Sequence, residues 1–297
     1  MSRIHDALKR AEQERATSIG GHVETTLVQP EMQPISMPPL GQPTVTMPSP
    51  VAGFTYEGLL ARCPQTNWTP DQRTMLFFHD DENRSGAEAF RTLRSRLYQI
   101  REKLPLKRLM VTSALPKEGK SFVTANLGQV MVRQQGRRAL IIDADLRSPG
   151  MHRHLGAPQT PGLSDYLLGE CDEFSVLQRG PMENLFFLPA GRVVSSAPEL
   201  LTNGRLKLLL QRVEPIFDWI IMDTPPVIPV ADSTLLANFC DGVLMVVRSN
   251  ATPSDLARRA RDEFQDKLLL GVVLNGAPSG KLERSKYYYG EAVSSHA

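Results

Sequence analysis

Long apolar runs and clustered cysteines are both missing from this chain of 297 residues. No stretch reaches the roughly 18–20 consecutive apolar residues that a membrane-spanning helix needs, so we expect no direct membrane span. The three cysteines lie far apart without metal or disulfide spacing, which favours reduced thiols in a reducing compartment. The formal net charge is only +2, so the overall charge indicates no nucleic-acid partner. The charged first residues do not resemble a secretory signal, and we expect a cytoplasmic protein.

The composition divides the chain into four zones. Residues 1–19 have apolar side chains at helical spacing, which predicts a short amphipathic helix. Residues 20–68 contain many prolines that interrupt helices and strands, which predicts a largely disordered linker. Residues 69–280 alternate strand-like and helix-like segments and form the main domain. Residues 281–297 form a charged tail that contains tyrosines.

The main domain alternates two kinds of segment. Short apolar runs predict buried parallel strands at Leu109–Thr112, Ala139–Ile142, Leu185–Leu188, Trp219–Met222, Val243–Val247 and Leu268–Leu274. Helical patterns lie between or before them, at 88–103, 121–134, 199–213 and 254–264. This alternation predicts an α/β fold with a doubly wound, mostly parallel sheet. Ligands of such sheets bind beyond the carboxyl ends of the strands.

A candidate phosphate-binding loop follows the first predicted strand. It consists of Ala114, Leu115, Pro116, Lys117, Glu118, Gly119, Lys120 and Ser121, with Phe122 next in the helix. Gly119 lets the backbone approach phosphate oxygens where a Cβ would collide, and amides at the helix start point at the anion. Lys120 can reach the β- and γ-phosphates, and the Ser121 hydroxyl can bind magnesium. Ala114 departs from the general pattern, which has glycine at this position.

Three aspartates end predicted strands at the same edge of the sheet. Asp143 and Asp145 close one strand and point to the same side if the chain stays extended. Asp223 closes another strand beside a proline-rich turn. One such aspartate often only caps a turn, but three beside a phosphate loop favour a site for ATP and Mg²⁺. The candidate magnesium ligands are therefore these three carboxylates and Ser121.

The motifs together resemble the bacterial tyrosine kinases of the capsular and exopolysaccharide family, which are P-loop proteins. In that family the phosphate loop precedes an Asp-x-Asp-x-Arg motif, matched here by Asp143, Asp145 and Arg147. A later Asp-x-x-Pro motif is matched by Asp223 and Pro226. The resemblance implies a P-loop NTPase fold of the class shared with partitioning ATPases and MinD.

Further family motifs occur in the same order along the chain. A Glu-x-x-Arg-x-x-Arg signature used in self-association is matched by Glu88, Arg91 and Arg94. The family's autophosphorylated tail is matched by Tyr287, Tyr288 and Tyr289. The resemblance also implies that Asn275 contacts adenine, although an Asn-Gly turn explains this residue almost as well.

The resemblance implies an ATP- and Mg²⁺-dependent protein-tyrosine autokinase that regulates exopolysaccharide or capsule synthesis or export. Its implied catalytic residues are Lys120, Asp143, Asp145 and Asp223, with Asp143 slightly favoured as the proton acceptor. The implied partners are a membrane polysaccharide co-polymerase as activator, a cognate phosphatase and further copies of the chain in a ring. The co-polymerase would recruit the chain to the inner face of the membrane.

A related family offers the main alternative. Partitioning and division-site ATPases carry an extra lysine at the second position of the phosphate loop. This chain has Leu115 there, followed by Pro116, as in the kinases. The alternative function is a nucleotide-switched positioning ATPase without kinase activity.

Overall fold

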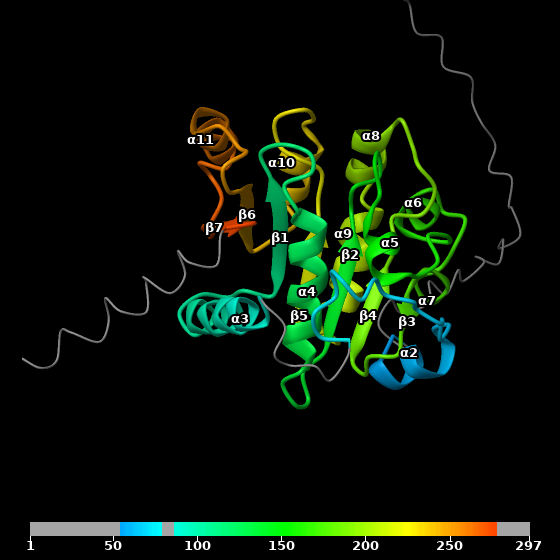
Figure 1. Cartoon of the computed structure of the whole chain (residues 1–297). Helices are drawn as coiled ribbons and strands as arrows, with labels where there is room; N and C mark the ends of the chain where they lie inside the picture. Colours follow the sequence, from blue (N-terminus) through cyan, green and yellow to red (C-terminus); the bar gives the residue numbers. More distant parts are fainter. Residues whose placement is uncertain (1–53, 79–85, 278–297) are drawn as a thin grey trace, which may run out of the picture. The chain divides into compact units, whose positions relative to one another are not determined.

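A seven-stranded sheet forms the centre of the computed structural model, which describes residues 54–78 and 86–277 (Figure 1). The strand order is β3-β4-β2-β5-β1-β6-β7, and only the β3–β4 pair is antiparallel. The strands are β1 (Arg108–Ser113), β2 (Ala139–Asp143), β3 (Gln178–Arg179), β4 (Leu185–Leu188), β5 (Trp219–Asp223), β6 (Gly242–Arg248) and β7 (Leu269–Asn275). The predicted doubly wound, mostly parallel sheet is confirmed, and β3 is the one strand of this sheet that the apolar runs did not indicate.

Helices pack on both faces of this sheet. One group comprises α3 (Ala87–Arg101), α4 (Lys120–Val132) and α5 (Met151–Leu155). The other group comprises α2 (Tyr56–Arg62), α6 (Leu163–Leu167), α7 (Glu173–Val176), α8 (Ala197–Thr202), α9 (Arg205–Val213), α10 (Asp232–Ala237) and α11 (Ser254–Asp262). Right-handed crossovers between parallel strands produce this two-sided arrangement.

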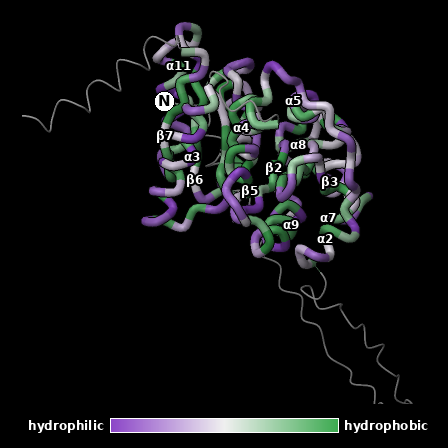
Figure 2. The backbone as a smooth tube through the Cα atoms, turned by 60° about the horizontal axis from the view of Figure 1, so that its bottom comes forward, coloured by the Kyte–Doolittle hydropathy of each residue, from purple (hydrophilic) through white to green (hydrophobic). Residues whose placement is uncertain are grey.

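The sheet is apolar on both faces because helices cover both. Leu109 and Val111 of β1 pack with α3 and α4, whereas Met110, between them in sequence, packs with α10 and α11. Side chains alternate between the two faces of a strand, so a strand covered on both sides reads as an unbroken apolar run. Figure 2 shows this apolar interior along α4, β2 and β6.

The carboxyl ends of β1, β2 and β5 meet at one edge of the sheet. The register of β2 and β5 pairs Asp143 with Asp223, the last residue of each strand. Ser113, the last residue of β1, leads directly into the predicted phosphate loop. Hydrogen bonding between strands therefore brings three distant parts of the sequence to one place.

The structure corrects two predicted elements. The predicted helix over 199–213 is two helices, α8 and α9, because the chain turns at Gly204 with a φ of 86° that favours glycine. The last predicted strand, β7, lies at the edge of the sheet instead of inside it. Its Val272 and Leu274 side chains are 54% and 56% exposed.

The predicted linker over 20–68 is wrong in its last part. Residues 54–68 pack on the domain: α2 begins after Thr55, whose side chain caps the helix by accepting from the Gly58 amide. Leu59 is fully buried in the core, and Trp68 packs against Phe187 of β4. The amphipathic helix predicted within residues 1–19 lies outside the described residues. No helix in 54–78 or 86–277 combines the length and apolar character needed to cross a bilayer.

Candidate nucleotide site

The predicted phosphate loop joins β1 to the start of α4. Its backbone makes a tight turn with left-handed conformations at Lys117 (φ 65°) and Gly119 (φ 94°). Helix α4 has no side-chain cap and no acidic residue in its first turn. Its first amides and the positive end of its dipole are therefore available to an anion. This local structure fits the triphosphate of a nucleotide.

Gly119 also lies in close contact with the end of β7. A Cβ at this position would stand 2.0 Å from the Asn275 amide nitrogen, well inside van der Waals contact. The Asn275 side chain donates instead to the Glu118 carbonyl oxygen, with a separation of 2.9 Å. Asn275 thus contacts the loop backbone, a role that the adenine-contact prediction did not include.

Lys120 and Ser121 contact carboxylates from two neighbouring strands. The Lys120 ammonium lies 3.0 Å from Asp145 and 3.5 Å from Asp223. The Ser121 hydroxyl donates to Asp223 at 2.6 Å, and Thr124 one turn later lies 3.4 Å from the other oxygen of the same carboxylate. The first turn of α4 and the ends of β2 and β5 therefore form one polar cluster.

The Asp143 carboxylate is fully buried, like that of Asp223. One oxygen accepts from the amides of Gly150 and Met151 at the start of α5, at 3.2 and 3.1 Å. The other oxygen accepts from the Asp145 amide at 3.2 Å. Strand β2 ends at Asp143, and the chain bends at 146–148 before α5 begins.

Burial and mutual repulsion shift the titration of this cluster. Burial raises the pKa of Asp143 to about 7; the neighbouring Asp223 adds to the rise and Lys120 opposes it. Burial also raises the pKa of Asp223, against the opposing effects of Lys120 and the Ser121 hydrogen bond. Burial by itself would lower the pKa of Lys120, but three carboxylates raise it above its usual value. Lys120 therefore stays cationic.

Arg147 binds Asp232 at the start of α10. Its guanidinium donates to both carboxylate oxygens, at 2.6 and 3.2 Å, and this pairing raises the pKa of Arg147. Asp232 is almost fully buried, whereas the Arg147 side chain is 37% exposed. Sequence reasoning missed Asp232, because no motif spacing links it to Arg147.

The donor set fits magnesium held together with a nucleotide. Among the described residues, no three His, Cys, Asp or Glu side chains converge as a ready metal cage. Magnesium usually takes only one or two protein carboxylates and completes its shell with phosphate oxygens and water. The Ser121 hydroxyl and the Asp223 carboxylate, which touch each other, are oxygen donors of the right kind at the head of the phosphate loop.

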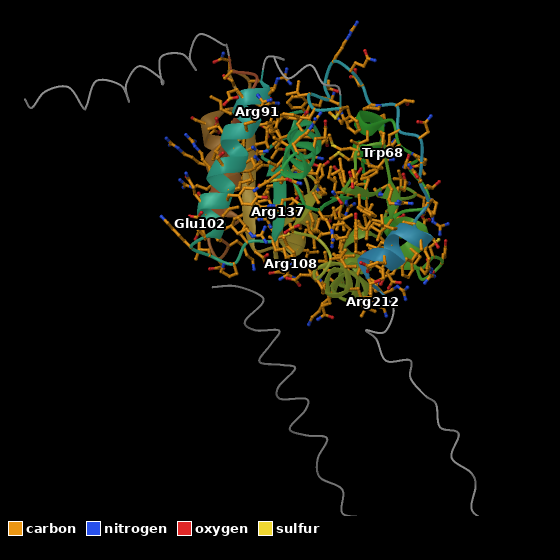
Figure 3. The ribbon with its side chains drawn as sticks, turned by 90° about the horizontal axis from the view of Figure 1, so that it is seen from below. Trp68, Arg91, Glu102, Arg108, Arg137 and Arg212 are labelled. Carbon is orange, nitrogen blue, oxygen red and sulfur yellow. The ribbon has the colours of Figure 1, made fainter. Side chains whose placement is uncertain are left out.

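Other predicted residues lie elsewhere. Glu88, Arg91 and Arg94 are on α3, with Arg91 3.3 Å from Glu88, and Figure 3 shows Arg91 near one end of this helix and Glu102 near the other. Arg94 donates to the Val130 carbonyl of α4 at 2.9 Å, so it also holds two helices together. The Phe122 ring packs edge-on against Phe90 of α3. The three tail tyrosines lie outside the described residues.

Comparison with known proteins finds related kinases. No protein-family model matches the chain. Tyrosine-protein kinase YwqD of Bacillus subtilis (strain 168) is 34% identical over 205 residues, which cover 68% of this chain and 86% of that protein. The succinoglycan biosynthesis transport protein ExoP of Rhizobium meliloti (strain 1021) is 29% identical over 232 residues, covering 76% of this chain but only 29% of ExoP.

Solved structures give the same result. The kinase domain of Escherichia coli tyrosine kinase ETK matches with a TM-score of 0.66 and 28% identity, covering 70% of this chain and 82% of that one. The chimerical protein CapA2B2 matches with a TM-score of 0.65 and 29% identity, covering 75% and 97%. Septum site-determining protein MinD from Pyrococcus horikoshii OT3 shares the fold, with a TM-score of 0.50 and 20% identity over 60% and 76%.

The chain therefore has the same fold as MinD, with the predicted phosphate loop between β1 and α4. The similarity to YwqD and to the ETK kinase domain identifies the family. The chain belongs to the family of bacterial tyrosine-protein kinases.

Proposed function

We propose that the protein transfers the γ-phosphoryl group of ATP to tyrosines of its own C-terminal tail in a Mg²⁺-dependent reaction. The observation that carries this proposal is the meeting of Lys120 and Ser121 with Asp145 and Asp223 at the start of α4. Phosphoryl transfer depends on positioning and charge neutralisation, and this cluster offers both a fixed cation and a set of oxygen donors.

Each residue of the cluster has a proposed role. Lys120 and the amides of the phosphate loop would bind the phosphates, and Asp145 would hold the Lys120 ammonium in place. Ser121 and Asp223 would hold magnesium, which neutralises phosphate charge when bound. Asp143, whose orientation is set by backbone amides, is the proposed proton acceptor.

The reaction would break one bond and form one. The phenol oxygen of the tyrosine attacks the γ-phosphorus, the bond to the β–γ bridging oxygen breaks, and ADP leaves with that electron pair. The phenolic proton passes to a carboxylate, for which Asp143 is our candidate. A free phenol has a pKa of about 10, so a positioned base is needed near neutral pH.

The parts beyond the main domain would supply substrate and location. We propose 281–297 as the phosphorylated tail and 1–19 as a docking helix for a partner. Glu88, Arg91 and Arg94 would join subunits into a ring, in which one tail reaches the next active site by a head-to-tail contact. A membrane co-polymerase of polysaccharide export would act as activator and recruit the chain to the membrane, and a cognate phosphatase would reset the tail.

Mass spectrometry of the tail tests this function. Purified protein is incubated with ATP and Mg²⁺, and phosphotyrosine is located by peptide sequencing. We expect phosphate on Tyr287, Tyr288 or Tyr289, and none in the Lys120→Met variant. The triple variant with phenylalanine at the three positions should lose the signal but still bind ATP. ATP hydrolysis without phosphotyrosine would contradict the kinase proposal and favour the positioning ATPase.

A further inference from the structure

The phosphate loop contains a buried negative charge. The Glu118 side chain is almost fully buried, although it lies in the loop that we propose binds phosphate. Its carboxylate turns back on the loop itself and accepts from the Leu115 amide at 2.7 Å. It therefore closes the loop between its second and fifth positions.

The same carboxylate ties the loop to the neighbouring strands. Its second oxygen accepts from the hydroxyl of Thr252, which follows β6. The Thr252 hydroxyl in turn accepts from the Arg248 amide at 3.1 Å. The Asn275 side chain donates to the Glu118 carbonyl, and the Arg248 guanidinium donates to the Lys117 carbonyl at 3.3 Å. Residues at and just after the ends of β6 and β7 thus hold Lys117 and Glu118 of the loop in place.

These contacts converge on the strained part of the loop. The Lys117 backbone adopts a left-handed conformation, which residues other than glycine and asparagine rarely take. Such a conformation persists only where surrounding contacts hold it. Here its carbonyl binds Arg248 and the next side chain, Glu118, is bound at both oxygens.

A carboxylate inside an anion site has an electrostatic cost. Like charges repel most strongly where water is excluded, so Glu118 opposes the binding of a triphosphate. Its hydrogen bonds to Leu115 and Thr252, however, hold the loop ready before the ligand arrives, which reduces the entropy lost on binding. The two effects act in opposite directions on ATP affinity and can be separated by substitution.

We infer that Glu118 is a positioning residue that pre-forms the phosphate loop through Leu115 and Thr252, at the expense of ATP affinity. This inference rests on the proposed function, because it takes ATP as the ligand. Among the described residues, Glu118 forms no ion pair with a lysine, arginine or histidine.

Two substitutions at Glu118 separate charge from geometry. Glu118→Gln removes the charge but keeps an acceptor for the Leu115 amide and a donor for the Thr252 hydroxyl. Glu118→Ala removes the same charge and both hydrogen bonds. The difference between the two variants therefore isolates the positioning contacts. Thr252→Val removes one contact and leaves the charge in place.

The experiment measures the Kd for ATP with Mg²⁺ by calorimetry on the full chain at low and high salt. We expect Glu118→Gln to bind ATP about three- to tenfold more tightly than the wild type, with a gain that shrinks as salt screens the charge. We expect Glu118→Ala to bind at least tenfold more weakly than Glu118→Gln, and Thr252→Val more weakly than the wild type. Glu102→Gln, which removes a carboxylate from the far end of α3, is the charge control (Figure 3).

The outcomes distinguish the inference from the proposed function. If the wild type binds no ATP, the proposed function fails. If the wild type binds ATP and phosphorylates its tail, equal affinities for Glu118→Gln and Glu118→Ala would overturn the inference alone. The inference also fails if Glu118→Gln gains nothing at low salt. Thermal unfolding without nucleotide confirms that each variant is folded, and Thr252→Val tests the same network if Glu118→Ala does not fold.

Discussion

The Ser121 hydroxyl donates a 2.6 Å hydrogen bond to the Asp223 carboxylate, joining the first turn of α4 to the end of β5. The two residues are 102 positions apart in the chain, and the strand order β2-β5-β1 brings them together. We propose that magnesium and the triphosphate bind at this contact.

Asp223→Asn should therefore lower tail phosphorylation by about 10²–10³-fold, the loss typical of removing one electrostatic contact to a transition state. The amide keeps an acceptor for Ser121 but removes the charge next to Lys120. Phosphotyrosine formation per minute is the measurement. Asp218→Asn, at the opposite end of β5, is the matched control and should keep wild-type activity although it weakens the Arg137 ion pair. Equal losses in both variants would contradict a role specific to the carboxyl edge.

Asp143→Asn should change how stability depends on pH in the metal-free protein. The pKa of Asp143 is raised to about 7 from 3.8, so the folded state holds a proton that the unfolded state has lost between these values. Stability from this group therefore falls as pH rises from about 4 to 7. The difference in melting temperature, variant minus wild type, should grow from pH 5 to pH 8. The variant also loses a hydrogen bond. That loss lowers stability equally at both pH values, so it does not change the expected trend.

Thermal unfolding at pH 5 and pH 8 without nucleotide or metal measures this difference. Asp255→Asn on α11 provides a control with an exposed carboxylate. A constant difference between variant and wild type across the two pH values would show that Asp143 does not titrate in this range.

Arg147→Ala should destabilise the protein by about 1–3 kcal/mol, because it leaves the buried Asp232 carboxylate without its two charged hydrogen bonds. Asp232→Asn should destabilise the protein less, because burying a neutral amide costs less free energy than burying an unpaired charge. The double variant should be more stable than the sum of the two single effects predicts. Urea unfolding of the four proteins gives the coupling energy, and additivity within about 0.5 kcal/mol would disprove the pairing.

Arg94→Ala should lower thermal stability as well as any assembly into rings. Its hydrogen bond to the Val130 carbonyl holds α3 on α4, and a charged hydrogen bond contributes about 1.5–3 kcal/mol. Arg96→Ala, exposed on the same helix, is the control and should change neither property. Melting temperature and sedimentation velocity separate the two effects. A variant with normal stability but lost assembly would assign Arg94 to the subunit interface alone.

Much of the fold followed from local patterns in the sequence. Six apolar runs marked six strands within a residue or two. For the inner strands the reason is that a strand covered on both faces is apolar throughout. The seventh strand, β3, has two residues and is polar, so its pairing with β4 depends on the neighbouring chain. The predicted helix ran across Gly204, whereas α8 ends at Thr202 and α9 begins at Arg205.

For the candidate site, too, the sequence predicted one part and the tertiary structure decided the rest. Residue types and their spacing in the sequence predicted Lys120 and Ser121 in a phosphate loop, and Asp143 and Asp223 at strand ends. The structure brings these groups together at the start of α4 and the ends of β2 and β5. Which groups contact one another was decided by the strand order, which has no local signal in the sequence. The partners Asp232 of Arg147 and Thr252 of Glu118 are 85 and 134 residues away, and only packing of the folded chain places them within hydrogen-bonding distance.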